Sequence, residues 1–348
     1  MFRDRAVVAE GSWLRRTAPW VAPVGWGAVA VSWRMWCPLA REPGLPMRVA
    51  TSVVFLTVGM GIVLGVRCGL RRELARVRAV ADATQQVLLR PPPARLDGLT
   101  VAAGQLSAFR GAAVGGDLYE AAATPYGVRI VIGDVRGHGL AALGAVVALL
   151  GSFREAVHDE PELAGVLRRL DRALARHLRD RAPDARDAHP VAEEFVTLLL
   201  LEIHPDGRVA TLICGHPGPY RLGGRRIEPL SVGDPLPPLG AFPLPADLVP
   251  YRGGLLRPGE TLVLHTDGAE EARDHRGRFF PLTAVLAGAA RQAPAELVRH
   301  VHTALLRHTG GRLTDDVALL VVRNDRVRVP AQPAEPGLRR TRPAPSPH

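Results

Sequence analysis

The sequence contains no lysine, and each of its 44 basic residues is an arginine. This absence excludes enzymes that hold a nucleotide phosphate with a P-loop lysine, protein kinases that use a strand lysine, and enzymes that form a Schiff base with their substrate. Any chemistry that the chain performs must therefore come from other side chains or from a bound cofactor.

Cysteine is also scarce, with Cys37, Cys68 and Cys214 far apart and without CxxC spacing. Three such residues are too few for a disulfide framework, which is consistent with a reduced, cytoplasmic setting for the large domain. Cys214 is most simply a small apolar core residue. The sequence lacks the CxxxxxR loop of cysteine phosphatases, so no protein nucleophile of that kind is available.

The net charge of +10 lies outside the middle of the chain. Residues 1–80 hold 12 arginines and 4 acids, residues 324–348 hold 5 and 2, and residues 81–323 hold 27 and 28. A nucleic-acid-binding domain would carry its basic residues within the folded part, and no helix-turn-helix, zinc-finger or RNP signature is present. We therefore predict no nucleic-acid partner.

Two uncharged runs occur near the N-terminus, at residues 18–33 and 49–66. Tryptophans stand near both margins of the first run, as in an interfacial aromatic belt, and a spanning helix needs about 20 residues. We predict a membrane anchor over residues 1–66 that contains two transmembrane helices. A single span, a signal peptide or a buried helix is the alternative for the first run, but no A-x-A cleavage pattern follows it.

Arginines flank these runs and predict the orientation of the anchor. Arginines cluster immediately after the second run and also precede the first. By the positive-inside rule, the N-terminus and the domain that follows the second run are therefore both in the cytoplasm. The short connection between the runs carries arginines too, which weakens this argument. We predict a multi-pass protein of the cell membrane with its large domain in the cytoplasm. The three groups are Arg67, Arg71, Arg72, Arg76 and Arg78; Arg3, Arg5, Arg15 and Arg16; and Arg34, Arg41 and Arg48.

Residues 67–95 predict a juxtamembrane helix followed by a proline-rich joint at Pro91, Pro92 and Pro93. Apolar or small residues recur at spacings of four and three, as in a coiled-coil seam, but for less than three heptads. Homodimerisation through this helix and packing of the helix on its own domain fit the pattern equally well.

Strand patterns outnumber helix patterns in the following part, residues 96–328. The segments EFVTLLLLEI and RVATLIC flank the turn-forming HPDG and predict a β-hairpin. Helices are predicted near residues 140–157, 161–180 and 293–309. We therefore expect an α+β fold with two stacked antiparallel sheets flanked by helices, preceded by the N-terminal transmembrane hairpin. Residues 329–348, rich in proline and arginine, predict a disordered tail.

Aspartates stand at the ends of apolar runs in three widely separated segments. Asp117 and Asp134 lie beside glycines, Asp267 follows the strand-like LVLHT, and Asp315 and Asp316 precede the apolar VALLVV. Carboxylates that converge repel each other unless a cation lies between them, and Mg²⁺ and Mn²⁺ prefer such all-oxygen sites. The pattern predicts a single metal site assembled by a sheet.

The ordered motifs VGGDLYE, GDVRGHGLAA, FVTLLLLEI, CGHPGPYRL, LRPGETLVLHTDGAEEARD and TDDVALLVVR resemble the metal-dependent protein phosphatases (PPM, type 2C-like). The similarity is to their bacterial SpoIIE-like, RsbU-like branch and covers about residues 88–323. It implies an αββα sandwich and two Mn²⁺ or Mg²⁺ ions. By this resemblance the catalytic, metal-binding residues are Asp117, Asp134, Asp267 and Asp315, with Asp134 bridging the ions and the carbonyl of Val135 as a further ligand.

Neighbouring residues are assigned less prominent roles. Asp316 is expected to cap the start of a strand, and Glu270, Glu271 and Asp274 to be surface or capping charges. His138 could protonate the leaving oxygen, but turn packing is the preferred role, and His216 is expected to be structural. The phosphate-binding arginine of some relatives is replaced by Ala112, which leaves Arg110 and Arg136 as candidates.

The resemblance implies a membrane-tethered phosphatase that hydrolyses phosphoserine and phosphothreonine with a two-metal-activated water. The substrate that it implies is a phosphorylated STAS-domain anti-anti-sigma factor in partner-switching signalling. The alternative is a catalytically inactive phosphatase fold that serves as a binding module in a membrane signalling complex. The intact set of aspartates favours the enzyme.

Overall fold

A computed structural model describes residues 25–29, 31–33, 35–36, 45–108, 115–137, 139–181, 195–224 and 226–326 of the chain. The chain divides into two compact units, Met1–Asp82 and Ala83–His348. The division falls within the segment for which the sequence predicts a juxtamembrane helix.

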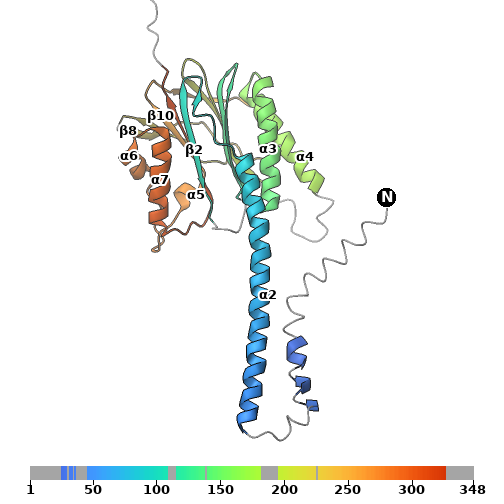
Figure 1. The fold of residues 1–348 in the computed structure, drawn as a ribbon. Helices are drawn as coiled ribbons and strands as arrows, with labels where there is room; N and C mark the ends of the chain where they lie inside the picture. Colours follow the sequence, from blue (N-terminus) through green and yellow to red (C-terminus); the bar gives the residue numbers. More distant parts are fainter. Residues whose placement is uncertain are drawn as a thin grey trace, which may run out of the picture. The chain divides into compact units, whose positions relative to one another are not determined.

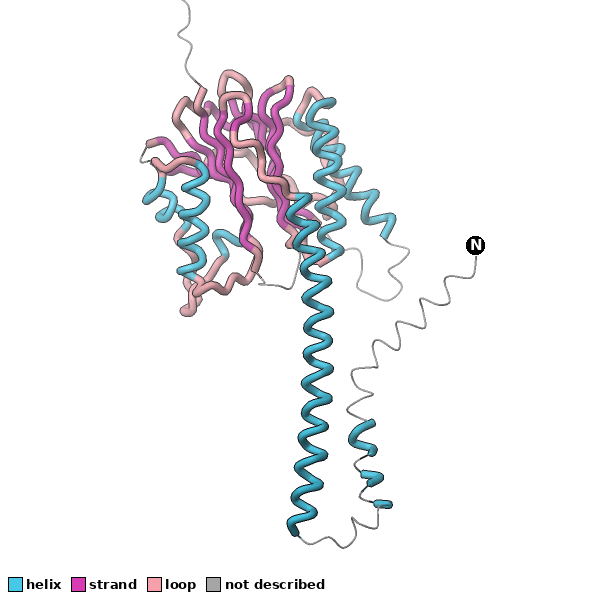
Figure 2. The backbone as a smooth tube through the Cα atoms, viewed as in Figure 1, coloured by secondary structure: helices cyan, strands magenta, loops and turns pink. Residues whose placement is uncertain are grey.

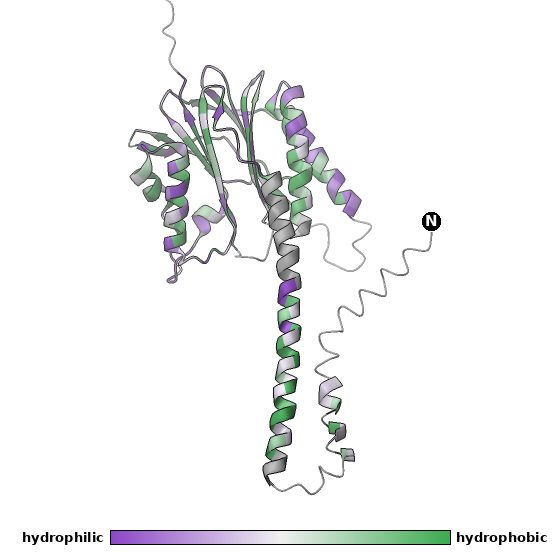
Figure 3. Cartoon of the chain, viewed as in Figure 1, coloured by the Kyte–Doolittle hydropathy of each residue, from purple (hydrophilic) through white to green (hydrophobic). Residues whose placement is uncertain are grey.

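The first unit is dominated by helix α2, Leu45–Leu88, a single helix of 44 residues. Within it, Val49–Arg72 is long and apolar enough to cross a membrane, and none of its most apolar window is buried. In Figure 3 this stretch of α2 is mostly green, for hydrophobic residues, with paler residues between them. It is the only such helix in the described part of the chain. The run at residues 18–33 lies partly outside the described residues, so the second span stays a prediction.

The second unit contains two antiparallel sheets, which confirms the predicted sandwich (Figure 1). The six-stranded sheet has the order β1-β2-β11-β10-β7-β8 and the five-stranded sheet the order β3-β4-β5-β6-β9. The strands of the first are β1 Arg95–Leu96, β2 Leu99–Leu106, β11 Val317–Asn324, β10 Thr261–His265, β7 Tyr220–Gly223 and β8 Arg226–Pro229. Those of the second are β3 Asp117–Thr124, β4 Gly127–Val135, β5 Val196–Ile203, β6 Arg208–Cys214 and β9 Tyr251–Leu255.

Helices cover the outer face of each sheet, as the tube in Figure 2 shows. Helices α3 and α4 contact each other and the five-stranded sheet, and α5, α6 and α7 contact the six-stranded sheet. Their bounds are α3 Leu140–Asp159, α4 Leu163–Arg181, α5 Gly268–Glu271, α6 Leu282–Ala289 and α7 Pro294–His308.

Strand β11 is buried on both faces and contributes side chains to two hydrophobic clusters. Its residues Leu320 and Val322 belong to the hydrophobic cluster that includes the five-stranded sheet, whereas Leu319 and Val321 pack in the cluster with α6 and α7. Because side chains alternate across a strand, a strand buried on both faces reads as a continuous apolar run. The run VALLVV is therefore apolar throughout.

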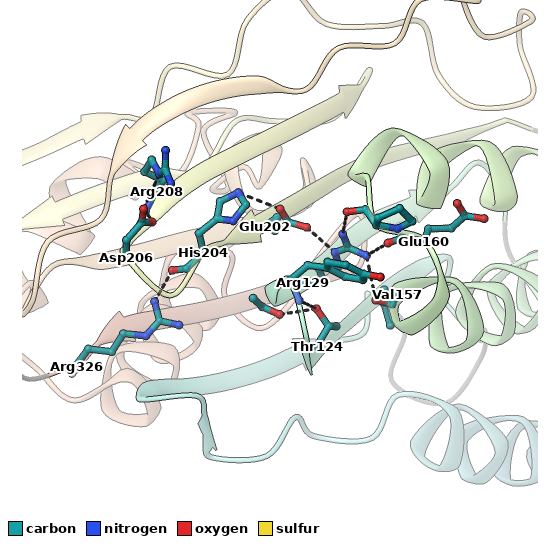
Figure 4. A network of polar contacts seen from close by, with 12 residues as sticks. Thr124, Arg129, Val157, Glu160, Glu202, His204, Asp206, Arg208 and Arg326 are labelled. Atoms are coloured by element: carbon teal, nitrogen blue, oxygen red, sulfur yellow. Dashed lines mark hydrogen bonds and ion pairs between the residues drawn. The ribbon is translucent and has the colours of Figure 1, made fainter.

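A buried ion pair lies near the start of β4, far from that strand's acidic end (Figure 4). Arg129 is fully buried, and its Nε donates to Glu202 Oε2 over 2.5 Å. Its remaining nitrogens donate to the carbonyls of Val157 in the last turn of α3 and of Glu160 and Pro161 just after it. Each side-chain nitrogen of this buried arginine thus has a hydrogen-bond acceptor, and these bonds connect the end of α3 to the sheet.

Replacing Arg129 should be among the most destabilising changes in the domain. We expect Arg129→Met to lower the free energy of unfolding by about 3–5 kcal/mol, because buried Glu202 loses its arginine partner and keeps only the contact of its Oε1 with His204 Nε2. Glu202→Gln should cost less, since the guanidinium keeps its carbonyl acceptors. The double variant Arg129→Met/Glu202→Leu should regain part of the loss. Denaturant titration followed by circular dichroism checks this series, and a loss below about 1 kcal/mol in Arg129→Met contradicts it.

Candidate metal centre

Acidic residues from three segments meet where the two sheets end on the same side. Asp117 opens β3 and Asp134 lies one residue before the end of β4, and the two are direct register partners. Asp267 follows β10, and Asp315 and Asp316 precede β11 in the neighbouring sheet. The sequence separates these residues by up to about two hundred positions, and the sandwich brings them into electrostatic contact.

The carboxylates of this cluster repel one another, and the pKa values of four of them are raised. Burial raises the pKa of Asp117 well above its usual range, and the carboxylates of Asp134, Asp316 and Asp315 raise it further. Burial likewise raises the pKa of Asp134 to about 7, with contributions from Asp267, Asp315 and Asp316. These groups therefore hold their protons far more tightly than isolated aspartates do.

The acids of the six-stranded sheet show the same effect. Burial, followed by the charges of Asp315 and Glu271, raises the pKa of Asp267. Burial also raises the pKa of Asp316, although the amide of Ala108 donates to its Oδ1 over 2.8 Å and opposes the rise. Asp315 is exposed and accepts the amide of Asp316. Its charge reaches the other carboxylates from the solvent side of the cluster.

Glycines allow the backbone to approach these carboxylates closely. A Cβ on Gly115 would lie 2.0 Å from Asp316 Oδ2, and one on Gly116 would lie 2.3 Å from the carbonyl oxygen of Val135 and 2.7 Å from Asp134 Oδ1. Any larger residue would have to displace the groups that form the cluster. Both positions before Asp117 are therefore glycine because no room is left there for a side chain.

Thr266 links the two sheets at the cluster. Its Oγ1 donates to Asp117 Oδ2 over 3.2 Å and accepts the amide of Ala318 over 2.9 Å. Its own amide donates to the carbonyl of Ala318 over 3.1 Å. One buried hydroxyl therefore ties the carboxylate of β3 to the backbone of β11, and it fixes the orientation of Asp117.

The structure brings together all four predicted aspartates, the carbonyl of Val135 beside them, and Asp316 as well. The arrangement is not a closed ligand set: in the part of the chain that the structure describes, no three acidic, histidine or cysteine side chains form a group that could hold a single ion. The charges of these carboxylates nevertheless raise the pKa values of Asp117 and Asp134, because charges in one region interact at separations longer than ligand contacts.

Other predicted residues fall beside the cluster or outside the described part. His138, Arg110 and Ala112 lie outside the described residues. His216 is buried and its Nδ1 lies 3.1 Å from Thr197 Oγ1, in keeping with a structural role. Asp274 accepts the amides of Arg276 and Arg278, which confirms the capping role expected of it.

The structure gives two residues a larger part in the cluster than the sequence predicts. Asp316, for which the sequence favours a strand cap, accepts a distant amide and also interacts with Asp117. Thr266 was read only as part of a strand. Its position directly before Asp267 was a usable signal, because a hydroxyl at the end of a buried strand needs a partner.

Comparison with known families places these features in context. The sequence model of the family described as Stage II sporulation protein E (SpoIIE) matches residues 124–325, more than half of the chain. The matched part includes Asp134, Asp267, Asp315 and Asp316, whereas Asp117 lies just before it.

Solved structures show the same fold. The RsbU and RsbW domains of Rv1364c from Mycobacterium tuberculosis are 26% identical over 65% of this chain, with a TM-score of 0.52. The match spans 60% of that protein's length. The SiaA-PP2C domain of Pseudomonas aeruginosa is 19% identical over 74% of this chain and 98% of its own, with a TM-score of 0.53.

The raised pKa values predict how the stability of the EDTA-treated protein depends on pH. Between about pH 4 and the folded pKa of about 7, the folded state binds more protons at Asp134 than the unfolded state does, so stability falls as pH rises. We expect Asp134→Asn to raise Tm at pH 7.5 by about 2–8 °C, the shift for a gain of about 1–2 kcal/mol in a domain of this size.

Differential scanning calorimetry at pH 5 and pH 7.5 measures this effect. At pH 5 the stabilisation should be clearly smaller than at pH 7.5, because pH 5 lies only about one unit above the pKa of about 3.9 for an unfolded aspartate. A variant that is equally stable or less stable than the wild type at pH 7.5 would show that the carboxylates do not repel each other.

Proposed function

The chain belongs to the SpoIIE family and carries a PP2C-type phosphatase domain, and we propose that it is a membrane-tethered, metal-dependent serine/threonine protein phosphatase. The main observation in support of the proposal is the cluster of carboxylates where the two sheets end. Burial and the charges of its members raise the pKa values of Asp117 and Asp134. The substrate class is a protein that carries phosphoserine or phosphothreonine.

The chemistry of the donors, rather than their spacing, suits Mn²⁺ or Mg²⁺ ions, and we propose that the site takes two. We assign the ligands to Asp117, Asp134, Asp267, Asp315 and the carbonyl of Val135, with Asp134 as the bridge. All are hard oxygen donors, and buried carboxylates with raised pKa values gain most from a cation. When bound, such ions lower the pKa of a water molecule and neutralise phosphate charge during hydrolysis.

The chain's own residues hold this site in shape. Thr266 fixes Asp117 and joins it to β11, while Gly115 and Gly116 let the backbone lie against the carboxylates. Asp316 lies on the same side and is held by the amide of Ala108, so it is placed to adjust the charge of the site. A rigid, preorganised arrangement of this kind lowers the cost of reaching the transition state.

Membrane attachment is the second part of the proposal. In the first unit, Trp26 Nε1 donates to the carbonyl of Phe55 over 3.0 Å, and the rings of Trp26 and Trp33 lie 5.3 and 6.4 Å from that of Phe55. These contacts support a helical hairpin formed by the first run and α2. With the arginines that follow Val66, they favour a multi-pass anchor and a cytoplasmic phosphatase domain.

We also propose the class of partner, which the family relationship supports. The Mycobacterium tuberculosis relative joins RsbU and RsbW domains. We place this chain in partner-switching signalling of the same kind, where it would act on a phosphorylated STAS-domain anti-anti-sigma factor. Homodimerisation through the juxtamembrane part of α2 is consistent with the seam in the sequence.

Activity tests the proposal. The full-length protein in detergent should release phosphate from a phosphoserine protein only with added Mn²⁺ or Mg²⁺. Asp134→Ala and Asp267→Ala should each reduce turnover more than about a hundredfold, because they remove metal ligands. Asp234→Ala, which removes an exposed acid outside the cluster, is the matched control and should leave turnover unchanged.

Two outcomes contradict this reading in different ways. Metal-independent turnover, or full activity in Asp134→Ala, overturns the mechanism. A folded wild-type protein that hydrolyses no phosphoprotein favours the binding-module alternative.

The natural cysteines report the topology of the anchor. In intact cells, a membrane-impermeant maleimide should label Cys37, which lies between the two runs, and spare Cys68, which follows the second run. In a Cys37→Ser background, Ser12→Cys should stay unlabelled, because a hairpin keeps the N-terminus in the cytoplasm. Labelling of that cysteine indicates a single span, and labelling of Cys68 contradicts the orientation.

A further inference from the structure

The acidic cluster has a defined position along the strands of the five-stranded sheet. Asp134 pairs with Asp117 on one side and with Thr197 on the other, so the three residues form one row across β3, β4 and β5. Directly paired residues in antiparallel strands project from the same face. The carboxylates of Asp117 and Asp134 therefore share a face with the hydroxyl of Thr197.

A second row continues beyond the first. The amide of Arg136 donates to the carbonyl of Phe195 over 2.9 Å, which extends the β4–β5 ladder by one pair. Arg136 and Phe195 each lie two residues beyond a member of the first row, Asp134 and Thr197. Because side chains alternate along a strand, they return to the carboxylate face about 7 Å further along.

The side chains of this second row contact each other. The guanidinium carbon of Arg136 lies 5.0 Å from the centre of the Phe195 ring. Stacking on an aromatic ring restrains the guanidinium while leaving its N–H groups free to donate. The contact confirms that both side chains lie on one side of the sheet.

In the part of the chain that the structure describes, Arg136 has no carboxylate partner. Arg154, Arg221 and Arg278 are each paired with a carboxylate, whereas within the described residues Arg136, like several other exposed arginines, takes part in no ion pair. It is exposed, and the chain has no lysine that could supply a positive charge in its place.

We propose that Arg136, held by Phe195, is the substrate-binding residue that grips the phosphate oxyanion beside the carboxylate cluster. The planar guanidinium presents paired N–H donors that match two oxygens of a phosphate monoester. An arginine side chain reaches across the gap of about 7 Å between the two rows. The assignment rests on the proposed phosphatase function, and it names the group that recognises the anion.

Three substitutions test three properties of this residue. Arg136→Gln removes the charge, Arg136→Lys keeps the charge but removes the paired donors, and Phe195→Leu removes the aromatic ring that contacts the guanidinium. Arg136→Gln should weaken phosphate binding about ten- to a hundredfold, the range for loss of a charged hydrogen bond. Arg136→Lys should recover part of this, because it keeps the charge and loses the paired donors. Phe195→Leu should weaken binding by a smaller factor, since it frees the guanidinium without removing it.

Isothermal titration of the full-length protein in detergent with inorganic phosphate, in the presence of Mn²⁺, measures the effect without requiring turnover. Titration with Mn²⁺ alone should give the same affinity in Arg136→Gln as in the wild type, since Arg136 acts on the anion. Arg226→Gln, which removes an exposed arginine on the edge strand β8, should change neither affinity. With a phosphoserine peptide, Arg136→Gln should raise KM more than it lowers kcat.

The outcomes separate this inference from the proposed function. If the wild type binds phosphate, Arg136→Gln binds it weakly and no phosphoprotein is hydrolysed, the phosphatase proposal fails and the role of Arg136 stands. Unchanged phosphate affinity in Arg136→Gln overturns the inference even in an active enzyme. A wild type that does not bind phosphate, or an Arg136→Gln variant that loses Mn²⁺ affinity to the same extent, also overturns it.

Discussion

Repulsion among aspartates that the fold gathers at one end of two sheets is the constraint on which this structure depends. Asp117 is buried beside Asp134, and Asp315 and Asp316 reach them from the neighbouring sheet. Burying carboxylates of like charge costs stability, so the cluster indicates a function other than stabilising the fold. The glycines before Asp117 leave space for the acids to lie close together, and the hydroxyl of Thr266 holds Asp117 in place by a hydrogen bond.

Strand β4 shows the contrast within nine residues. Near its start, Arg129 is buried, and each of its three side-chain nitrogens donates to a carboxylate or a carbonyl. Near its end, Asp134 is surrounded by charges of its own sign, and its pKa rises to about 7. The first arrangement stabilises the packing of α3 on the sheet, and the second stores free energy that a bound cation or a proton releases. We interpret the first as structural and the second as functional.

Much of the fold could be predicted because local patterns suffice for it. The HPDG turn between two apolar runs predicts the β5–β6 hairpin, and the structure confirms it. The short strands β7, β8 and β9 were not predicted, since four or five residues with glycines and arginines carry no clear period. The site is harder to predict, because Asp316 and Thr266 acquire partners 208 and 149 positions away that only the folded sandwich brings near. Residue types indicated the chemistry, and the pairing of distant strands determined which side chains take part in it.

We propose that this cluster of carboxylates binds two divalent cations. Calorimetric titration of the EDTA-treated full-length protein with Mn²⁺ at pH 7.5, and again after Asp134→Asn, measures it most directly. We predict two ions per chain, release of protons on binding because Asp134 is partly protonated at this pH, and loss of both ions in the variant. Binding of no ion, or unchanged binding of two ions after Asp134→Asn, would contradict the account.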